Sequence, residues 1–228
     1  MQIYVPYFGG DHSSLFSLWV QQLVASGCSC SVHFIFPDSL PPPESRGNRL
    51  KNAEFISVPM HKLKKRVRLN TAGTEKMDIK EMLALYSLRL LAAPAFVMDL
   101  DALIQHDPFK SFEGKGDFGM VRDPMIRWAK NAPEHNAGVM YFSGNRKEEI
   151  ATHFEKAWDE LQITVPTNSV LLGQKAWSLA HHRVKGFMME DTMNWSRCWG
   201  PNSDAKIYHY HGRSGKFMLS EKYGLQCP

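Results

Sequence analysis

The stretch AFVMDLDALI, residues 95–104, carries the strongest structural signal in this chain of 228 residues. Its apolar start, residues 96–98, predicts a buried strand, because aromatic and β-branched side chains fill a pleated surface well. Asp99 and Asp101 follow, and side chains two residues apart lie on the same side of an extended backbone. Two neighbouring carboxylates repel each other, so we expect a cation, a proton or a basic side chain between them.

Strand-like and helix-like segments alternate on both sides of this stretch. We expect strands at residues 2–8, 30–36, 54–60, 95–104, 117–121, 137–143 and 205–212, and helices at 13–25, 74–91, 147–161 and 168–180. This alternation predicts an α/β fold whose central sheet is mostly parallel and flanked by helices. Because no internal repeat or change of composition marks a linker, one domain over residues 1–228 is expected.

Ligands of such sheets bind beyond the carboxyl ends of the strands. Three features of the sequence are expected at those ends: residues 9–11 (GGD), residues 37–38 (PD) and the Asp99/Asp101 pair. The hard carboxylate oxygens of the pair, with water ligands left over, suit Mg²⁺ or Mn²⁺ bound together with substrate phosphates. The Asp-x-Asp motif therefore favours metal binding over a structural role.

The composition bounds the class of partner. Hydrophobic residues make up 43% of the chain, enough for a sizeable core, and the formal net charge is only +4. This mild charge gives no indication of a nucleic-acid partner. The basic run KLKKRVR (62–68) lacks interleaved aromatic residues, so a solvated face is the favoured interpretation and a flap over an anionic ligand the alternative.

The sequence also bears on the compartment. The first residues show no basic segment followed by a long apolar one, so we expect no signal peptide. No window approaches the roughly eighteen apolar residues of a membrane span. The four cysteines include no Cys-x-x-Cys pair: Cys28, Cys30, Cys198 and Cys227. Reduced thiols in the cytoplasm are the expected state.

Four segments, in order along the chain, resemble the GT-A-fold glycosyltransferases, in particular the retaining group that contains glycogenin and bacterial lipopolysaccharide galactosyltransferases. FVMDLDALIQHDPF (96–109) resembles that family's metal-binding strand, and HNAGVMYFSGN (135–145) its donor-pocket strand. LLGQKAW (171–177) falls where the family has an acid–glutamine pair at the start of a helix. KIYHYHGRSGK (206–216) resembles its histidine-x-x-glycine segment and phosphate-binding lysine.

This resemblance implies a metal-dependent, hexosyltransferase-like enzyme. Such an enzyme moves a sugar from a nucleoside-diphosphate sugar to a hydroxyl of a glycan or glycoprotein acceptor. Among donors the resemblance favours a UDP-sugar, with a GDP-sugar second, and it favours retention of the anomeric configuration over inversion.

The resemblance also implies roles for single residues at the metal and the diphosphate. Asp101 and His209 would ligate the metal directly, and Asp99 would reach the metal through water, or the donor ribose. Mn²⁺ accepts an imidazole beside carboxylates more readily than Mg²⁺ does. Gly212 would let the backbone approach the diphosphate. Lys216 would neutralise the departing diphosphate, a task that the neighbouring arginine could share.

Other positions would hold the nucleoside and the sugar of the donor. Asn136 and Ala137 match the strand that lines the donor-sugar pocket. Tyr7 would stack on the base, although a core position is nearly as well supported. Lys80 and Arg89 lie on the helix expected before the metal strand, where the family often places a basic residue near the donor. Arg89 could equally be a solvated helix residue.

The chain departs from the family pattern at Gly173, where the family has an acid. Gln174, expected under the anomeric carbon of the donor sugar, is therefore left without a carboxylate neighbour, and no nucleophile for a double displacement is assured. A front-face reaction, in which the leaving diphosphate assists the acceptor hydroxyl, needs none. Inversion would need a general base, for which Glu190, Asp191 and Asp123 are candidates.

Three further alternatives stay open. Trp195 and Trp199 are candidates for stacking on an acceptor sugar, but tryptophans are more often core residues. A metal-dependent nucleotidyltransferase also uses paired acids, although the segment YFGGDHSS (7–14) lacks the basic glycine-rich signature usual there. A sugar-nucleotide-binding protein without catalysis is the third.

Overall fold

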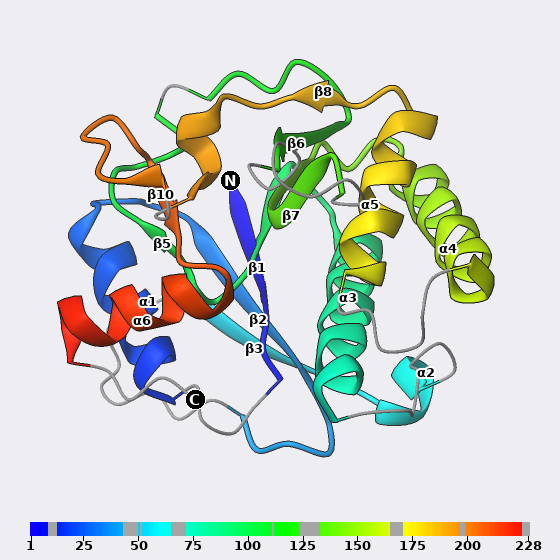
Figure 1. The fold of residues 1–228 in the computed structure, drawn as a ribbon, viewed down its shortest axis with the longest axis horizontal. Coiled ribbons are helices and arrows are strands. Elements are labelled where there is room, and N and C mark those ends of the chain that lie inside the picture. The colour runs from blue at the N-terminus through cyan, green and yellow to red at the C-terminus, as the bar shows by residue number, and fades with distance from the viewer. Residues whose placement is uncertain are drawn as a thin grey trace.

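The computed structural model describes residues 1–8, 13–42, 50, 52–64, 72–110, 112–123, 133–164, 171–196 and 199–224. Its centre is a seven-stranded sheet in the order β3-β2-β1-β4-β7-β6-β8 (Figure 1). The strands are β1 (Gln2–Pro6), β2 (Ser31–Pro37), β3 (Ala53–Val58), β4 (Ala95–Met98), β6 (Phe118–Arg122), β7 (His135–Phe142) and β8 (Phe187–Met188).

A second sheet of three short strands, in the order β5-β10-β9, lies beside the first. Its strands are β5 (Ala102–Ile104), β9 (Trp195–Ser196) and β10 (Ile207–His209). The helices are α1 (Ser13–Ala25), α2 (Met60–Lys64), α3 (Ala72–Leu90), α4 (Lys147–Thr164), α5 (Leu172–Arg183), α6 (Gly212–Tyr223) and the short 3-10 helix η2 (Asp191–Asn194).

Strands β3, β2, β1 and β4 run parallel to one another, and β7 runs antiparallel to both β4 and β6. The predicted α/β fold with a mostly parallel sheet is therefore confirmed. Every residue of β4 is buried, as expected for a strand with both faces covered.

The two faces of the sheet hold separate cores because side chains alternate along each strand. Ala95 and Val97 of β4 point into a core shared with α3, α4 and α5. Phe96 and Met98 point into a second core shared with α1, β5 and β10. In Figure 1 the first group of helices lies on the right of the sheet, and α1 and α6 lie on the left.

The prediction of one continuous strand over residues 95–104 is wrong. Strand β4 ends at Met98, and a turn follows in which the Ala102 amide donates to the Asp99 carbonyl (3.0 Å). Strand β5 then pairs antiparallel with β10, in the other sheet. The indole of Trp19 on α1 donates to the carbonyl of Ala102 (3.1 Å) and fixes this crossing. The two aspartates therefore lie on a turn between sheets.

The C-terminal helix α6 was not predicted from the sequence. The strand expected at 205–212 ends at His209, and α6 begins at Gly212. Gly224, at φ 64°, ends the helix in the left-handed region that favours glycine. Lys216 therefore lies on a helix rather than on an extended segment.

Several predicted features lie outside the described residues, namely 9–11, 65–68, 168–170, Cys198 and Cys227. Within the described part of the chain, no helix is both long and apolar enough to cross a membrane. Cys28 and Cys30 are free thiols whose sulfur atoms lie 3.5 Å apart.

Candidate functional site

Asp99, Asp101 and His209 converge at the turn that follows β4. The Nε2 atom of His209 lies 3.3 Å from Oδ1 of Asp101 and 3.8 Å from Oδ2 of Asp99. The three ligand atoms lie within 4.8 Å of one another. This convergence follows from the second sheet, where His209 on β10 pairs with Ala102 on β5. The structure thus brings together the three residues predicted to bind a metal.

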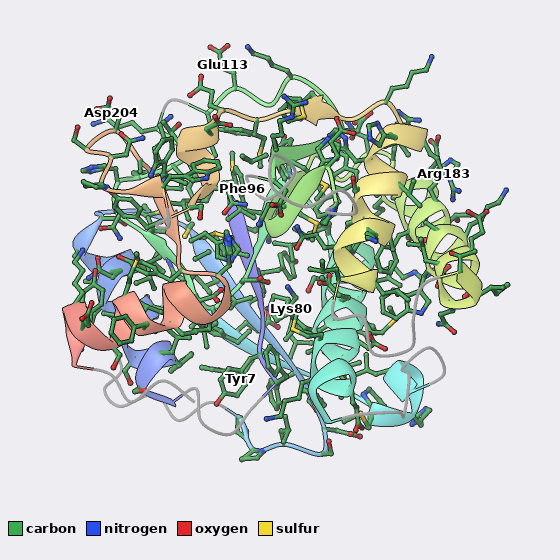
Figure 2. All side chains as sticks on the ribbon, in the orientation of Figure 1. Tyr7, Lys80, Phe96, Glu113, Arg183 and Asp204 are labelled. Carbon is green, nitrogen blue, oxygen red and sulfur yellow. The ribbon has the colours of Figure 1, made fainter. Side chains whose placement is uncertain are left out.

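Two lysines flank the acids. Lys80 on α3 donates to Oδ2 of Asp99 (2.8 Å) and extends into the centre of the molecule (Figure 2). Lys216 on α6 donates to Oδ2 of Asp101. Burial alone would raise the pKa of Asp101, but the charges of Lys216 and His209 outweigh burial and hold that pKa well below its ordinary value. The Asp101 carboxylate is therefore ionised at neutral pH.

Gly138 on β7 makes room for the histidine ring. A Cβ at this position would lie 2.0 Å from Cε1 of His209, a distance that no packing tolerates. The carbonyl of Gly138 also accepts a hydrogen bond from the Asp99 amide (2.8 Å). One glycine thus positions both an acid and the imidazole.

The donor set fits a divalent cation such as Mn²⁺. It offers two carboxylates and one imidazole, a combination that suits manganese better than magnesium. His209 is only 3% exposed, and no hydrogen bond within the described part of the chain satisfies its Nδ1 atom. A buried polar ring that lacks full pairing is costly unless it has another use.

Glu81, which no sequence motif indicates, contacts the site through Lys80. Its carboxylate lies 3.2 Å from Nζ of Lys80 and accepts a hydrogen bond from the indole of Trp177 (2.7 Å). Burial raises the pKa of Glu81, while Lys80 opposes the shift. Burial alone would lower the pKa of Lys80, but Asp99 and Glu81 outweigh it and raise that pKa. An acid on a long helix is usually solvated, so nothing in the residue pattern distinguishes Glu81 from a surface residue.

Glu81 also accounts for the departure from the family pattern at Gly173. A Cβ at Gly173 would lie 2.1 Å from Cγ of Glu81 and 2.8 Å from its Cδ. An aspartate or glutamate at residue 173 would therefore collide with the side chain of Glu81. In this chain the buried acid of that region comes from α3 and not from the start of α5.

A second polar network, built around Asp123, adjoins β7. The buried carboxylate of Asp123 accepts hydrogen bonds from Nδ2 of Asn136 (3.3 Å) and from the side-chain amide of Gln174. Oδ1 of Asn136 in turn accepts from the Gly138 amide (2.8 Å) and from Nδ2 of Asn194 (3.0 Å). The predicted residues Asn136 and Gln174 thus meet at one carboxylate. Gly138 links Asn136 to the aspartate cluster, because its amide donates to Asn136 and its carbonyl accepts from the Asp99 amide.

Three other predicted residues lie apart from these contacts. Tyr7, labelled in Figure 2, is 5% exposed just after β1. Its ring packs edge-on against Phe16. Its structure therefore favours the core alternative over base stacking. Ala137 lies in the core on the face with α3. The guanidinium of Arg89 contacts Glu155 (3.0 Å) near the far end of α3, which favours its solvated alternative.

The inverting-base candidates differ in burial. Asp191 and Glu190 are exposed at the start of η2, and it is Asn194 at the end of η2 that reaches Asn136. Asp123 is 3% exposed. The indole rings of Trp195 and Trp199 pack edge-on, with centroids 4.9 Å apart, and Trp199 is 38% exposed.

The N-terminus of α6 faces this region. Gly212 is its first residue, and the ring of His211, which precedes it, lies 4.8 Å from the His209 ring between centroids. Lys216 projects from the first turns of the same helix to Asp101. Unpaired amides at a helix N-terminus, together with a lysine, suit an anionic group.

Comparison with known proteins finds no match among family models or curated sequences, but several matches among solved structures. The galactosyltransferase LgtC, solved with donor and acceptor sugar analogues, matches with a TM-score of 0.68 at 14% identity, over 93% of this chain and 88% of LgtC. An active-site mutant of LgtC, glutamine to glutamate, matches with a TM-score of 0.67 at 14% identity, over 99% of this chain and 96% of that chain.

A eukaryotic enzyme has the same architecture. Mouse xyloside xylosyltransferase 1, in its apo form, matches with a TM-score of 0.59 at 13% identity, over 93% of this chain and 98% of the mouse chain. The matches span nearly the whole length of both partners. The protein therefore has the GT-A fold, shared with these glycosyltransferases, that its four sequence segments predicted.

Proposed function

We propose that this protein is a metal-dependent glycosyltransferase that moves a sugar from a nucleoside-diphosphate sugar to an acceptor hydroxyl. The observation that carries the proposal is the convergence of Asp99, Asp101 and His209 at the turn after β4. This cluster lies beyond the carboxyl end of a strand, where α/β sheets bind ligands. The chain has the same fold as the galactosyltransferase LgtC and mouse xyloside xylosyltransferase 1.

The charges of the cluster suit a diphosphate. Asp101 and His209, with Asp99 close by, would hold a divalent cation, which would supply positive charge for a diphosphate. Lys216 contacts the other carboxylate oxygen of Asp101, and together with the amides that begin α6 it would receive the departing diphosphate. We propose Mn²⁺ ahead of Mg²⁺, and a UDP-sugar ahead of a GDP-sugar.

We further propose that the reaction retains the anomeric configuration. The bond from the anomeric carbon to the diphosphate oxygen breaks, and its electron pair leaves with the diphosphate. The acceptor oxygen bonds to the same face of that carbon, and its proton passes to the diphosphate. Gln174 would orient the sugar, since a neutral amide is a poor nucleophile. LgtC also has an active-site glutamine.

Lys80 would act on the acids and not on the substrate. Its ammonium contacts both Asp99 and Glu81, so it holds two carboxylates in place. Asn136, which holds the Gly138 amide, would set the strand against which the donor sugar lies. The acceptor is proposed to be a glycan or glycoprotein.

Two measurements test the proposal. Thermal unfolding in the presence of UDP, GDP or ADP, each with and without Mn²⁺, should show the largest rise in Tm for UDP with Mn²⁺, because a ligand that binds only the native state stabilises it. UDP release from UDP-hexoses should then depend on Mn²⁺ and stop in excess chelator.

Each alternative class gives a different result. Release of pyrophosphate from a nucleoside triphosphate would identify a nucleotidyltransferase. Tight Mn²⁺-dependent binding of UDP-sugars without any turnover, with a panel of glycan acceptors present, would identify a binding protein. Absence of any Mn²⁺-dependent stabilisation by a nucleotide would overturn the proposed site.

A further inference from the structure

A second cluster of metal-ligating side chains lies away from the aspartate cluster, where β7 begins and α5 ends. It consists of Glu134, His135 and His182, whose ligand atoms lie within 4.8 Å of one another. Nε2 of His182 lies 2.7 Å from Oε2 of Glu134. The rings of His135 and His182 are 5.0 Å apart between centroids. Nothing in the proposed transfer reaction uses these three residues.

The cluster arises from one face of α5. Gln174, Ser178 and His182 are spaced four residues apart, so they lie on the same side of the helix. Their contacts run in the same order: Gln174 meets Asp123, Ser178 meets His135 and His182 meets Glu134. One polar stripe of α5 therefore runs beside β6 and β7, next to an apolar stripe in which Trp177 packs on Phe118 and Phe142.

His135 is built as a fixed ligand. It is 1% exposed, and its Nδ1 atom shares a hydrogen bond with the hydroxyl of Ser178 (2.8 Å). A partner on one ring nitrogen is what orients a metal-bound histidine and leaves the other nitrogen for the ion.

We propose that Glu134, His135 and His182 form a second metal site, which binds Zn²⁺. Two imidazoles and one carboxylate are a ligand set typical of zinc with one position left for water. Nitrogen ligands outnumber oxygen ligands here, so the site selects Zn²⁺ over Mn²⁺ and Mg²⁺, whereas the aspartate cluster has the opposite balance.

The surroundings of the cluster allow an ion to enter. The side chains of His182 and Glu134 are 52% and 41% exposed, so both can turn toward an ion from solvent while the buried His135 stays in place. His181 does not belong to this group of converging ligand atoms, and its Nε2 atom pairs with the carbonyl of Phe187 (3.0 Å). The bound ion joins the C-terminal end of α5 to the start of β7.

The site is independent of the proposed transferase function, and its test separates the two. Zn²⁺ binding is measured by competition with a chromophoric chelator, and Co²⁺ binding by its visible absorption, on the whole chain and on variants. Asp101→Asn, in the aspartate cluster, should leave the Zn²⁺ site intact. His182→Ala should weaken Zn²⁺ binding by at least about 100-fold, and Ser178→Ala, which removes only the orienting partner, by roughly 10- to 100-fold.

The matched control is His33→Ala. His33 also pairs with a glutamate, Glu54, at 2.8 Å, but that pair does not belong to a group of three ligands among the described residues. Its loss should leave Zn²⁺ and Co²⁺ binding unchanged. Zn²⁺ should also raise the Tm of Asp101→Asn, and not that of the double variant Asp101→Asn/His182→Ala, by mass action on the native state.

Two results would overturn the site. One is Zn²⁺ affinity in His182→Ala equal to that of the wild-type protein. The other is a Co²⁺ spectrum that disappears in Asp101→Asn and persists in His182→Ala, which would leave Glu134 and His182 as an ion pair only. Both results can be read on folded protein, because the side chain of His182 is 52% exposed.

Discussion

Nε2 of His209 lies 3.3 Å from Oδ1 of Asp101, on a strand and a turn far apart in the sequence. The contact exists because β10 pairs antiparallel with β5 and sets His209 opposite Ala102, the residue after Asp101. The second sheet therefore places an imidazole beside two carboxylates. The first two predictions below test this relationship.

The first prediction concerns the charge of Asp101. Asp101→Asn keeps the shape of the side chain but removes a charge that Lys216 and His209 keep ionised. We expect donor turnover to fall by more than about 100-fold, at least about 2.7 kcal/mol of transition-state stabilisation, and Tm to fall because Lys216 and His209 lose a charged partner, while the protein stays folded. Asp204→Asn, an exposed acid elsewhere, is the control. Turnover like the wild type, or full activity in excess chelator, would contradict the metal assignment.

The second prediction concerns the space beside the imidazole. In Gly138→Ala the added Cβ would lie 2.0 Å from Cε1 of His209. Because β7 is held by β4 on one side and β6 on the other, the ring must move and not the strand. We expect Mn²⁺ affinity, measured by calorimetry with UDP present, to fall at least about tenfold, alongside a loss of about 1–3 kcal/mol in the free energy of unfolding.

Gly119→Ala is the matched control for that loss of stability. Its Cβ would lie 2.6 Å from Cζ of Phe187, in the same sheet but away from His209. It should destabilise the protein to a similar degree and leave Mn²⁺ affinity unchanged. Equal affinity in the Gly138 and Gly119 variants would show that His209 does not bind the ion.

The sequence identified the acids but not the turn that arranges them. Apolar residues continue through Leu100 and into β5, and Leu100 is itself 8% exposed. Periodicity cannot distinguish a buried turn from a buried strand in such a run. Alternation along a strand, the reason first given for two acids on one side, is not what brings them together.

The sequence also missed α6 and Glu81, for different reasons. Gly212 and Gly215 lie within α6 and are poor helix formers, so the segment resembled a loop. Gly215 is required there because a Cβ would lie 2.3 Å from the Tyr210 carbonyl carbon. Glu81 forms its contacts with Lys80 and Trp177 only in the folded chain. Propensity and motif carry no such long-range information.

The third prediction concerns the departing diphosphate. Lys216→Ala removes the ammonium that α6 holds beside Asp101. Negative charge grows on the diphosphate in the transition state, so kcat should fall more than KM rises. Lys222→Ala, an exposed lysine in the last turn of α6, should change neither constant. A rise in KM alone would mean that Lys216 holds the donor in the ground state only.

The last prediction concerns Gln174 and the stereochemical outcome. Its amide donates to the buried carboxylate of Asp123, which also accepts from Asn136. A neutral amide held in this way can orient the donor sugar but cannot form a stable glycosyl ester. Gln174→Ala should therefore cut turnover by about 10- to 100-fold, a loss of roughly 1.4 to 2.7 kcal/mol, and leave nucleotide binding nearly intact. Lys175→Ala, the next residue of α5, is the control.

The anomeric configuration of the product, measured by NMR, should equal that of the donor. Inversion would instead transfer the chemistry to a carboxylate base, either the exposed Asp191 or the buried Asp123, and reduce Gln174 to a hydrogen-bond partner of that acid.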